Sequence, residues 1–143
     1  MPKVLIIGLG QLGLPVARYV KEKGFDTYGY DINSKTMEIA ERTAGIKQAN
    51  DFGSKDFDVF MISVSTHKQD DLSSPQIDGL LSIADKISRE AKKDGALVSI
   101  ESTISKGTSK KVFEILNQNG IKMVCIRGKR ARRKSVTCDR RGI

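Results

Sequence analysis

Three glycines near the start of the chain form the first group of residues that could hold a ligand. Gly8, Gly10 and Gly13 have the spacing Gly-x-Gly-x-x-Gly, after the apolar run KVLIIG and before a helix-like segment. In that context Gly8 allows a tight turn, Gly10 leaves room for a phosphate beside the backbone, and Gly13 allows close packing of helix and sheet. The free N–H groups at the start of the helix would then meet the pyrophosphate of a dinucleotide.

The second group is the carboxylate of Asp31, which ends the run TYGYD. An acid at this place accepts hydrogen bonds from the ribose hydroxyls of NAD and repels the 2′-phosphate of NADP. Lys35 follows closely enough to reach the adenosine end, which keeps NADP as the alternative. A purely structural alternative for Asp31 is an acid at the start of the next helix. We expect nucleotide binding, with NAD as the cofactor.

Small polar residues end the next two apolar runs, at SVST (63–66) and EST (101–103). Ligands of open parallel sheets bind beyond the carboxyl ends of the strands, so these residues extend the expected cofactor site. The site residues expected here are Val64, Ser65, Thr66, Glu101 and Thr103. Glu101 would orient cofactor or substrate, or accept N–H bonds from the next helix start. His67 is either a catalytic histidine or a solvated loop residue, and we favour the loop.

Apolar strands and amphipathic helices alternate along the chain, and these elements must position the candidate residues. We expect strands at 3–8, 25–31, 57–66, 96–103 and 121–126, with helices at 11–24, 34–45, 75–95 and 107–120. Strict alternation of this kind requires parallel pairing with helices on both faces. The sequence therefore predicts an α/β fold, a Rossmann-like doubly wound parallel sheet in a single domain over residues 1–126.

Helix signals fit these segments. Gly24 and Gly45 mark helix ends, Pro15 falls in a first turn, and Ser34 is expected to cap the helix that it opens. Apolar residues recur at helical spacing in each segment. They are Leu12, Val16, Tyr19 and Val20; then Met37, Ile39 and Ala40, expected to face inward; then Ile77, Leu80, Leu81, Ala84, Ile87 and Ala91; then Val112, Ile115 and Leu116.

The net charge of +8 is concentrated at one end. Residues 127–143 hold eight Lys or Arg and one acid, whereas residues 1–126 hold 17 basic and 16 acidic residues. This basic tail has no aromatic residue to stack on bases, so we expect no nucleic-acid partner. We expect the tail to lie outside the folded domain, as a disordered end or an artefact of the reading frame.

Metal, disulfide and membrane functions receive little support. Cys125 and Cys138 lack a CxxC spacing and His67 is the only histidine, so no metal site is expected. No apolar run is long enough to span a membrane, and we expect no cleavable signal before the first strand. We expect a cytoplasmic protein.

Four segments together resemble the N-terminal domain of the nucleotide-sugar 6-dehydrogenases: IIGLGQLGLPVA, GYDIN, FDVFMISVSTH and IESTISKGTSKKV. That family includes the UDP-glucose and GDP-mannose dehydrogenases, and the UDP-N-acetylmannosamine type is the most similar. The resemblance covers residues 2–124, and IESTISKGT is its most specific part.

The resemblance implies an NAD-dependent enzyme that oxidises a sugar-nucleotide alcohol to an acid in two hydride transfers. It implies that Gly8, Gly10, Gln11, Leu12, Gly13 and Asp31 bind NAD. It also implies that Thr66 and Thr103 lie by the nicotinamide, with Thr103 in a supporting catalytic role near the catalytic water.

The chain also departs from that family. Family members are about three times as long, and the cysteine nucleophile and the lysine lie in domains beyond this stretch. The segment VCIRGKRARRKS stands where the family has an acidic Pro-Glu turn. The resemblance therefore implies a shortened domain that is inactive alone, meets the nucleotide sugar only with further domains, and could form a homodimer. The alternatives are the N-terminal domain of a β-hydroxyacid dehydrogenase and a stand-alone nucleotide-binding module with a basic partner-binding tail.

Overall fold

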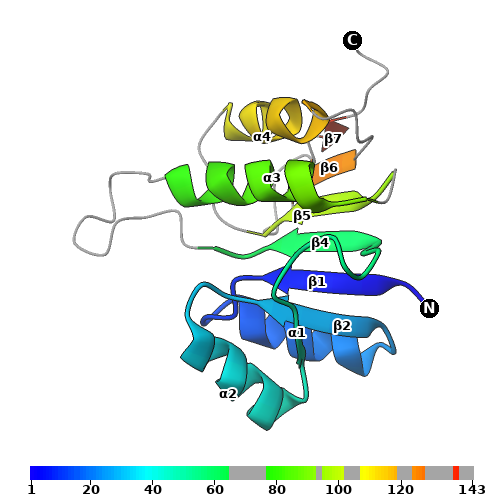
Figure 1. Ribbon diagram of the computed structural model, residues 1–143, viewed down its shortest axis with the longest axis vertical. Coiled ribbons are helices and arrows are strands. Elements are labelled where there is room, and N and C mark those ends of the chain that lie inside the picture. Colours follow the sequence, from blue (N-terminus) through cyan, green and yellow to red (C-terminus); the bar gives the residue numbers. More distant parts are fainter. Residues whose placement is uncertain (65–76, 93–94, 102–106, 119–123, 128–136, 139–143) are drawn as a thin grey trace.

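The computed structural model describes residues 1–64, 77–92, 95–101 and 107–118, and the backbone of 124–127 and 137–138. One sheet runs through the molecule in the order β3-β2-β1-β4-β5-β6-β7 (Figure 1). Its strands are β1 (Lys3–Ile7), β2 (Asp26–Tyr30), β3 (Lys47–Gln48), β4 (Val59–Ile62), β5 (Leu97–Ile100), β6 (Val124–Arg127) and β7 (Thr137–Cys138). All neighbours pair parallel except β6 and β7. The predicted Rossmann-like doubly wound fold is confirmed.

Among the described residues, four helices connect these strands: α1 (Gly13–Glu22), α2 (Ser34–Ala44), α3 (Asp78–Glu90) and α4 (Thr108–Asn117). The five predicted strands correspond to β1, β2, β4, β5 and β6. The first four are shorter than predicted, whereas β6 runs to Arg127, one residue past the predicted end. The two-residue strands β3 and β7 were not predicted, because they are too short to show a periodic pattern.

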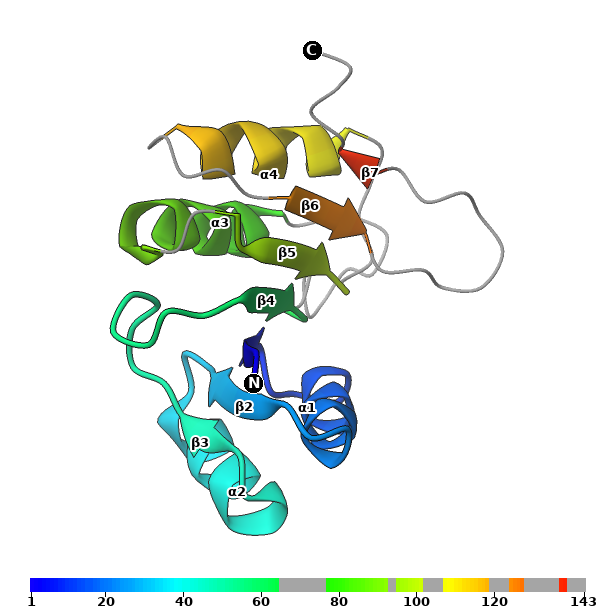
Figure 2. The same ribbon diagram turned by 90° about the vertical axis from the view of Figure 1, so that its right-hand side faces the viewer.

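Two apolar cores cover opposite faces of the sheet, because neighbouring side chains of a strand point to opposite sides. Val4 and Ile6 of β1 belong to the core under α1 and α2, while Leu5 and Ile7 belong to the core under α3 and α4. Figure 2 shows the sheet nearly edge-on, with α1 to one side and α3 to the other. The larger core also holds Phe52 and Phe57 from the segment between β3 and β4.

The helix expectations need three corrections. Asn33, not Ser34, is the N-cap of α2, and its side chain accepts a hydrogen bond from the Lys35 N–H at 3.0 Å. Both residue types cap helices well, so adjacent candidates cannot be ranked by type. Ile39 is 45% exposed rather than inward, since Met37 and Ala40 already fill the buried stripe of α2. Tyr19 is exposed on α1, where Ala17 is buried instead.

The ends of the helices agree with the prediction better than the cap of α2 and the inward-facing residues do. Gly45 caps α2 in the left-handed conformation at φ 64°, and Gly24 follows α1 with φ 92°. Helix α3 is shorter than the predicted 75–95, and Ala91 is already extended with ψ 131°. Its buried residues include Leu80, Ala84 and Ile87, as the stripe predicted.

Candidate functional site

The register of the sheet brings three strand ends to one level. Ile7 of β1 pairs with Tyr30 of β2 and with Ile62 of β4, so the next residues are Gly8, Asp31 and Ser63. Two hydrogen bonds fix this level: the Gly8 N–H donates to the Tyr30 carbonyl at 2.8 Å, and the Ser63 N–H donates to the Ile7 carbonyl at 2.7 Å. The strand order reverses between β1 and β4, which is the point where open α/β sheets bind ligands.

The three glycines of the loop serve different purposes. Gly8 has φ +93°, and a methyl group on it would lie 2.7 Å from the Ser63 carbonyl oxygen. A methyl group on Gly13 would collide with the Gly8 carbonyl oxygen, because α1 begins directly against the loop. A methyl group on Gly10 would meet no described atom within 4 Å. Gly8 and Gly13 are therefore required by the fold, whereas Gly10 borders open space.

The N-terminus of α1 has the features of an anion-binding site. Leu12 stands at the N-cap and has no polar side-chain atom with which to cap the first turn, which contains no acidic residue. The N–H groups at a helix start and the positive end of its dipole favour negative charge. Together with the open space beside Gly10, this end of α1 can hold a phosphate group.

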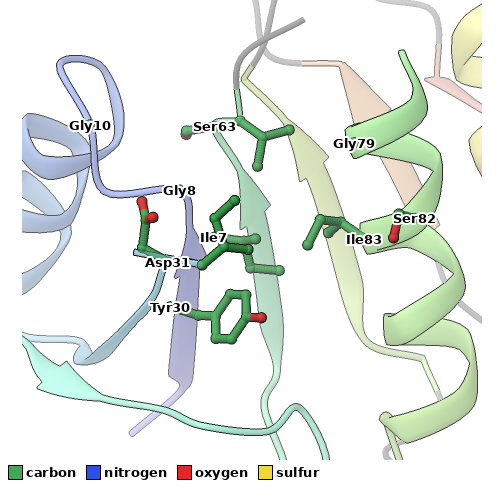
Figure 3. A pocket seen from close by; sticks show the side chains of 11 residues that line it. Ile7, Gly8, Gly10, Tyr30, Asp31, Ser63, Gly79, Ser82 and Ile83 are labelled. Atoms are coloured by element: carbon green, nitrogen blue, oxygen red, sulfur yellow. The ribbon is translucent and has the colours of Figure 1, made fainter. Parts of the chain in front are cut away.

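Asp31 joins the loop to the end of β2. Its Oδ2 accepts a hydrogen bond from the Leu9 N–H at 2.9 Å, and its Oδ1 accepts one from the Asn33 N–H at 2.9 Å. Figure 3 shows the carboxylate directed toward the glycine loop. A carboxylate has about four lone-pair positions, so the hydrogen bonds from the described residues leave two for hydroxyl donors of a ligand. The structural and the ligand-binding interpretations of Asp31 are thus compatible.

These strand ends border a cavity of about 520 Å³, a size typical of small-molecule sites. Helix α3 forms the wall opposite Asp31, through Gly79, Ser82 and Ile83 (Figure 3). The full lining is Ile7, Gly8, Gly10, Tyr30, Asp31, Ile32, Ser63, Val64, Gly79, Ser82 and Ile83.

Two observations indicate that this cavity fits a dinucleotide. The Ser63 Oγ is buried and has no hydrogen-bond partner among the described residues, although a buried hydroxyl normally has one. The space beside Gly10, which the side chain of another residue would fill, leaves room for a phosphate next to the backbone. The donor set therefore suits a ligand with a pyrophosphate and a ribose.

The structure brings some of the sequence-predicted residues together and separates others. Gly8, Gly10, Asp31 and Val64 line the cavity, and Gly13 supports the loop from behind. Gln11, Leu12 and Lys35 are exposed and do not belong to the lining. Ser65, Thr66, His67 and Thr103 lie outside the described residues, so their roles stay predictions.

Glu101 lies at the carboxyl end of β5, where its N–H donates to the Ile62 carbonyl at 2.8 Å. Its Oε1 accepts a hydrogen bond from the buried Ser99 hydroxyl at 2.5 Å. Glu101 is not part of the cavity lining, and its expected contact with the cofactor stays a prediction.

Several lining residues were missed by the sequence analysis. Tyr30 and Ile32 flank Asp31 at the carboxyl end of β2, and this position at a strand end could have indicated them. Ser82 and Ile83 sit beside the buried stripe of α3, and hydrophobic periodicity alone does not reveal that this flank borders a cavity.

No group of three or more His, Cys, Asp or Glu side chains that could hold a metal ion occurs among the described residues. Within the same residues, no helix is long and apolar enough to cross a membrane.

Comparison with known proteins agrees with this geometry. A family model for the NAD binding domain of 6-phosphogluconate dehydrogenase matches residues 3–126. The UDP-N-acetyl-D-mannosamine dehydrogenase of Methanococcus maripaludis is 32% identical over 136 residues, which cover 81% of this chain and 32% of that protein. The chain thus spans about a third of the length of such relatives.

Solved structures show the same fold. A UDP-glucose dehydrogenase from Pyrobaculum islandicum superposes with a TM-score of 0.73 at 20% identity, over 99% of this chain and 42% of that one. The UDP-N-acetyl-mannosamine dehydrogenase of S. aureus gives a TM-score of 0.66 at 25% identity, over 90% of this chain and 37% of that one. The chain therefore belongs to the family of the NAD binding domain of 6-phosphogluconate dehydrogenase and is similar in sequence to UDP-N-acetyl-D-mannosamine dehydrogenases.

Proposed function

We propose that this chain binds NAD in preference to NADP, with the adenosine ribose at Asp31, as the cofactor-binding part of a UDP-sugar dehydrogenase. The observation that carries the cofactor proposal is the position of Asp31 at the cavity, with its carboxylate beside the glycine loop. A 2′-phosphate placed there would meet a negative charge.

Different residues would bind different parts of the dinucleotide. The N-terminus of α1 and the backbone at Gly10 would hold the pyrophosphate, while Asp31 would accept hydrogen bonds from the ribose hydroxyls. Tyr30, Ile32 and Ile83 supply apolar surface around that position, as an adenine ring requires.

The proposed substrate class rests on the relatives. Several curated relatives are UDP-N-acetyl-D-mannosamine dehydrogenases, and the chain matches about a third of each. When bound, NAD supplies the hydride acceptor for oxidation of an alcohol. The part of the chain described here would bind and orient that acceptor.

Titration calorimetry of the purified chain tests the cofactor proposal. We expect NAD to bind and ADP-ribose to bind at the same site. NADP should bind at least about tenfold more weakly than NAD, since its extra phosphate is repelled. Equal affinity for NADP would overturn the cofactor preference, and a lack of heat with all three ligands would overturn the proposed function.

A further inference from the structure

Lys86 of α3 lies against two aromatic rings, one of which, that of Tyr30, lines the cavity. Its Nζ is 5.1 Å from the ring centroid of Tyr30 and 5.0 Å from that of Phe52. The two rings meet edge to face, with centroids 5.0 Å apart and planes at 86°. A cation within about 6 Å of an aromatic face is attracted by its quadrupole. One ammonium group thus contacts the end of β2 and the segment between β3 and β4.

Glu90, one turn further along α3, holds this arrangement in place. Its Oε2 lies 3.4 Å from the Lys86 Nζ, and its Oε1 accepts a hydrogen bond from the Phe52 N–H at 3.2 Å. A methyl group on Gly53 would collide with the Glu90 carbonyl oxygen, so the backbone approaches α3 closely there. The Lys86 side chain is only 26% exposed, so water screens its interactions incompletely.

The same contacts connect two walls of the cavity. Tyr30 lines it from β2, and Ser82 and Ile83 line it from α3. Residues three and four positions apart lie on one face of a helix, so Lys86 projects from the cavity-facing side of α3. The cluster of Tyr30, Phe52, Lys86 and Glu90 therefore sets how far the wall on α3 stands from the wall on β2.

We propose that Lys86 is a positioning residue for the cofactor: it holds the Tyr30 wall and the α3 wall at the separation that the adenosine half of a dinucleotide requires. This inference rests on the proposed function. Removal of the cation would leave both walls freer in the ligand-free protein, so that binding would have to order them and the affinity would fall.

Three variants test this role. Lys86→Met keeps most of the length of the side chain and removes the charge, and Lys86→Arg keeps the charge and the contact with the rings. Arg89→Met is the control, because Arg89 also forms an ion pair with a residue four positions away, Asp85, at 2.8 Å, but on an exposed part of α3. Affinities for NAD and ADP-ribose are measured by calorimetry, and the Tm of each variant by circular dichroism.

We expect Lys86→Met to lower the affinity for NAD about three- to tenfold, and to lower the affinity for ADP-ribose by the same factor. Lys86→Arg should restore the affinity, and Arg89→Met should leave it unchanged. Lys86→Met loses two ring contacts as well as an ion pair, so its Tm should fall further than that of Arg89→Met. Recovery of the affinity in Lys86→Arg is the result that identifies the cation over the rings as its source. If Lys86→Met fails to fold, Lys86→Gln takes its place.

The outcomes separate the two proposals. Wild-type protein that binds NAD, together with a Lys86→Met variant of equal affinity, would overturn the positioning role alone. An equal loss of affinity in Lys86→Arg or Arg89→Met would also overturn it, because the effect would not come from the cation over the rings. A wild-type chain that binds neither ligand would overturn the proposed function and this inference with it.

Discussion

The Asp31 carboxylate accepts a hydrogen bond from the Leu9 N–H at 2.9 Å, across 22 residues of sequence. This bond ties the glycine loop to the end of β2, so the two parts of the expected nucleotide site are held in one geometry before a ligand arrives. The other oxygen accepts the Asn33 N–H just ahead of α2. A single side chain thus orders two backbone segments beside the cavity.

Replacement of Asp31 should therefore change both stability and affinity. Asp31→Ala leaves two N–H groups without their acceptor, and we expect a loss of about 1–3 kcal/mol in the free energy of unfolding. NAD should bind at least about tenfold more weakly, because the acceptor of the ribose hydroxyls is gone. Urea unfolding and calorimetry measure the two effects.

The same position decides between NAD and NADP. Asp31→Asn retains an acceptor oxygen but removes the negative charge, so the preference for NAD over NADP should shrink toward unity. An Asp31→Asn variant that discriminates as strongly as the wild type would show that the carboxylate does not face the ribose.

Gly10→Ala should separate binding from folding. The added methyl group would meet no described atom within 4 Å, and Gly10 is not among the glycines with positive φ. We expect an unchanged Tm apart from the small general effect of replacing glycine. NAD affinity should fall about tenfold or more, because the methyl group occupies the space proposed for the pyrophosphate. Unaltered affinity would place the phosphates elsewhere.

Gly13→Ala should have the opposite profile. Its methyl group would collide with the Gly8 carbonyl oxygen, so α1 or the loop must move. Overpacking of a tight site costs about 1–3 kcal/mol or more, and we expect a loss in that range in urea unfolding. Gly10→Ala serves as the control with the same exchange three residues earlier. A Gly13→Ala protein as stable as the wild type would mean that α1 does not start against the loop.

The fold could be predicted because its pattern is redundant. Runs such as VLII are buried on both faces of the sheet, as Val4 and Leu5 show, and only a covered parallel sheet requires this. Local details were less predictable. Asn33 and Ser34 are both good caps, and the choice depends on how the chain leaves Asp31, which hydrogen-bonds the Asn33 N–H.

The lining of the cavity was predictable where backbone geometry defines it. Gly8, Gly10 and Asp31 follow from strand ends and turn chemistry, and they line the cavity. The wall on α3 could not be predicted, because Ser82 and Ile83 belong to no recognisable sequence motif. Their position at the cavity depends on how α3 packs across the sheet. The contact of Lys86 with Tyr30 and Phe52 depends on three segments far apart in the sequence.

Low pH should destabilise the turn that contains Phe52, because it protonates the carboxylate of Asp51. The Asp51 carboxylate accepts hydrogen bonds from the N–H groups of Ser54 and Gly53, and these bonds lower its pKa below the usual value, with a smaller contribution from Lys86. A lowered pKa in the folded state stabilises the fold above the unfolded pKa of about 3.9, and this contribution is lost as the pH falls through the folded pKa.

Asp51→Asn removes that titration. The difference in free energy of unfolding between wild type and Asp51→Asn should be constant above about pH 5 and should shrink below about pH 4. Urea unfolding at a series of pH values measures it, and Asp56→Asn, in the same segment, controls for the loss of one negative charge. Since Phe52 follows Asp51 and contacts Lys86, NAD affinity should weaken over the same acid range in wild type more than in Asp51→Asn. An identical pH profile in both proteins would show that the turn at Asp51 does not support the Lys86 cluster.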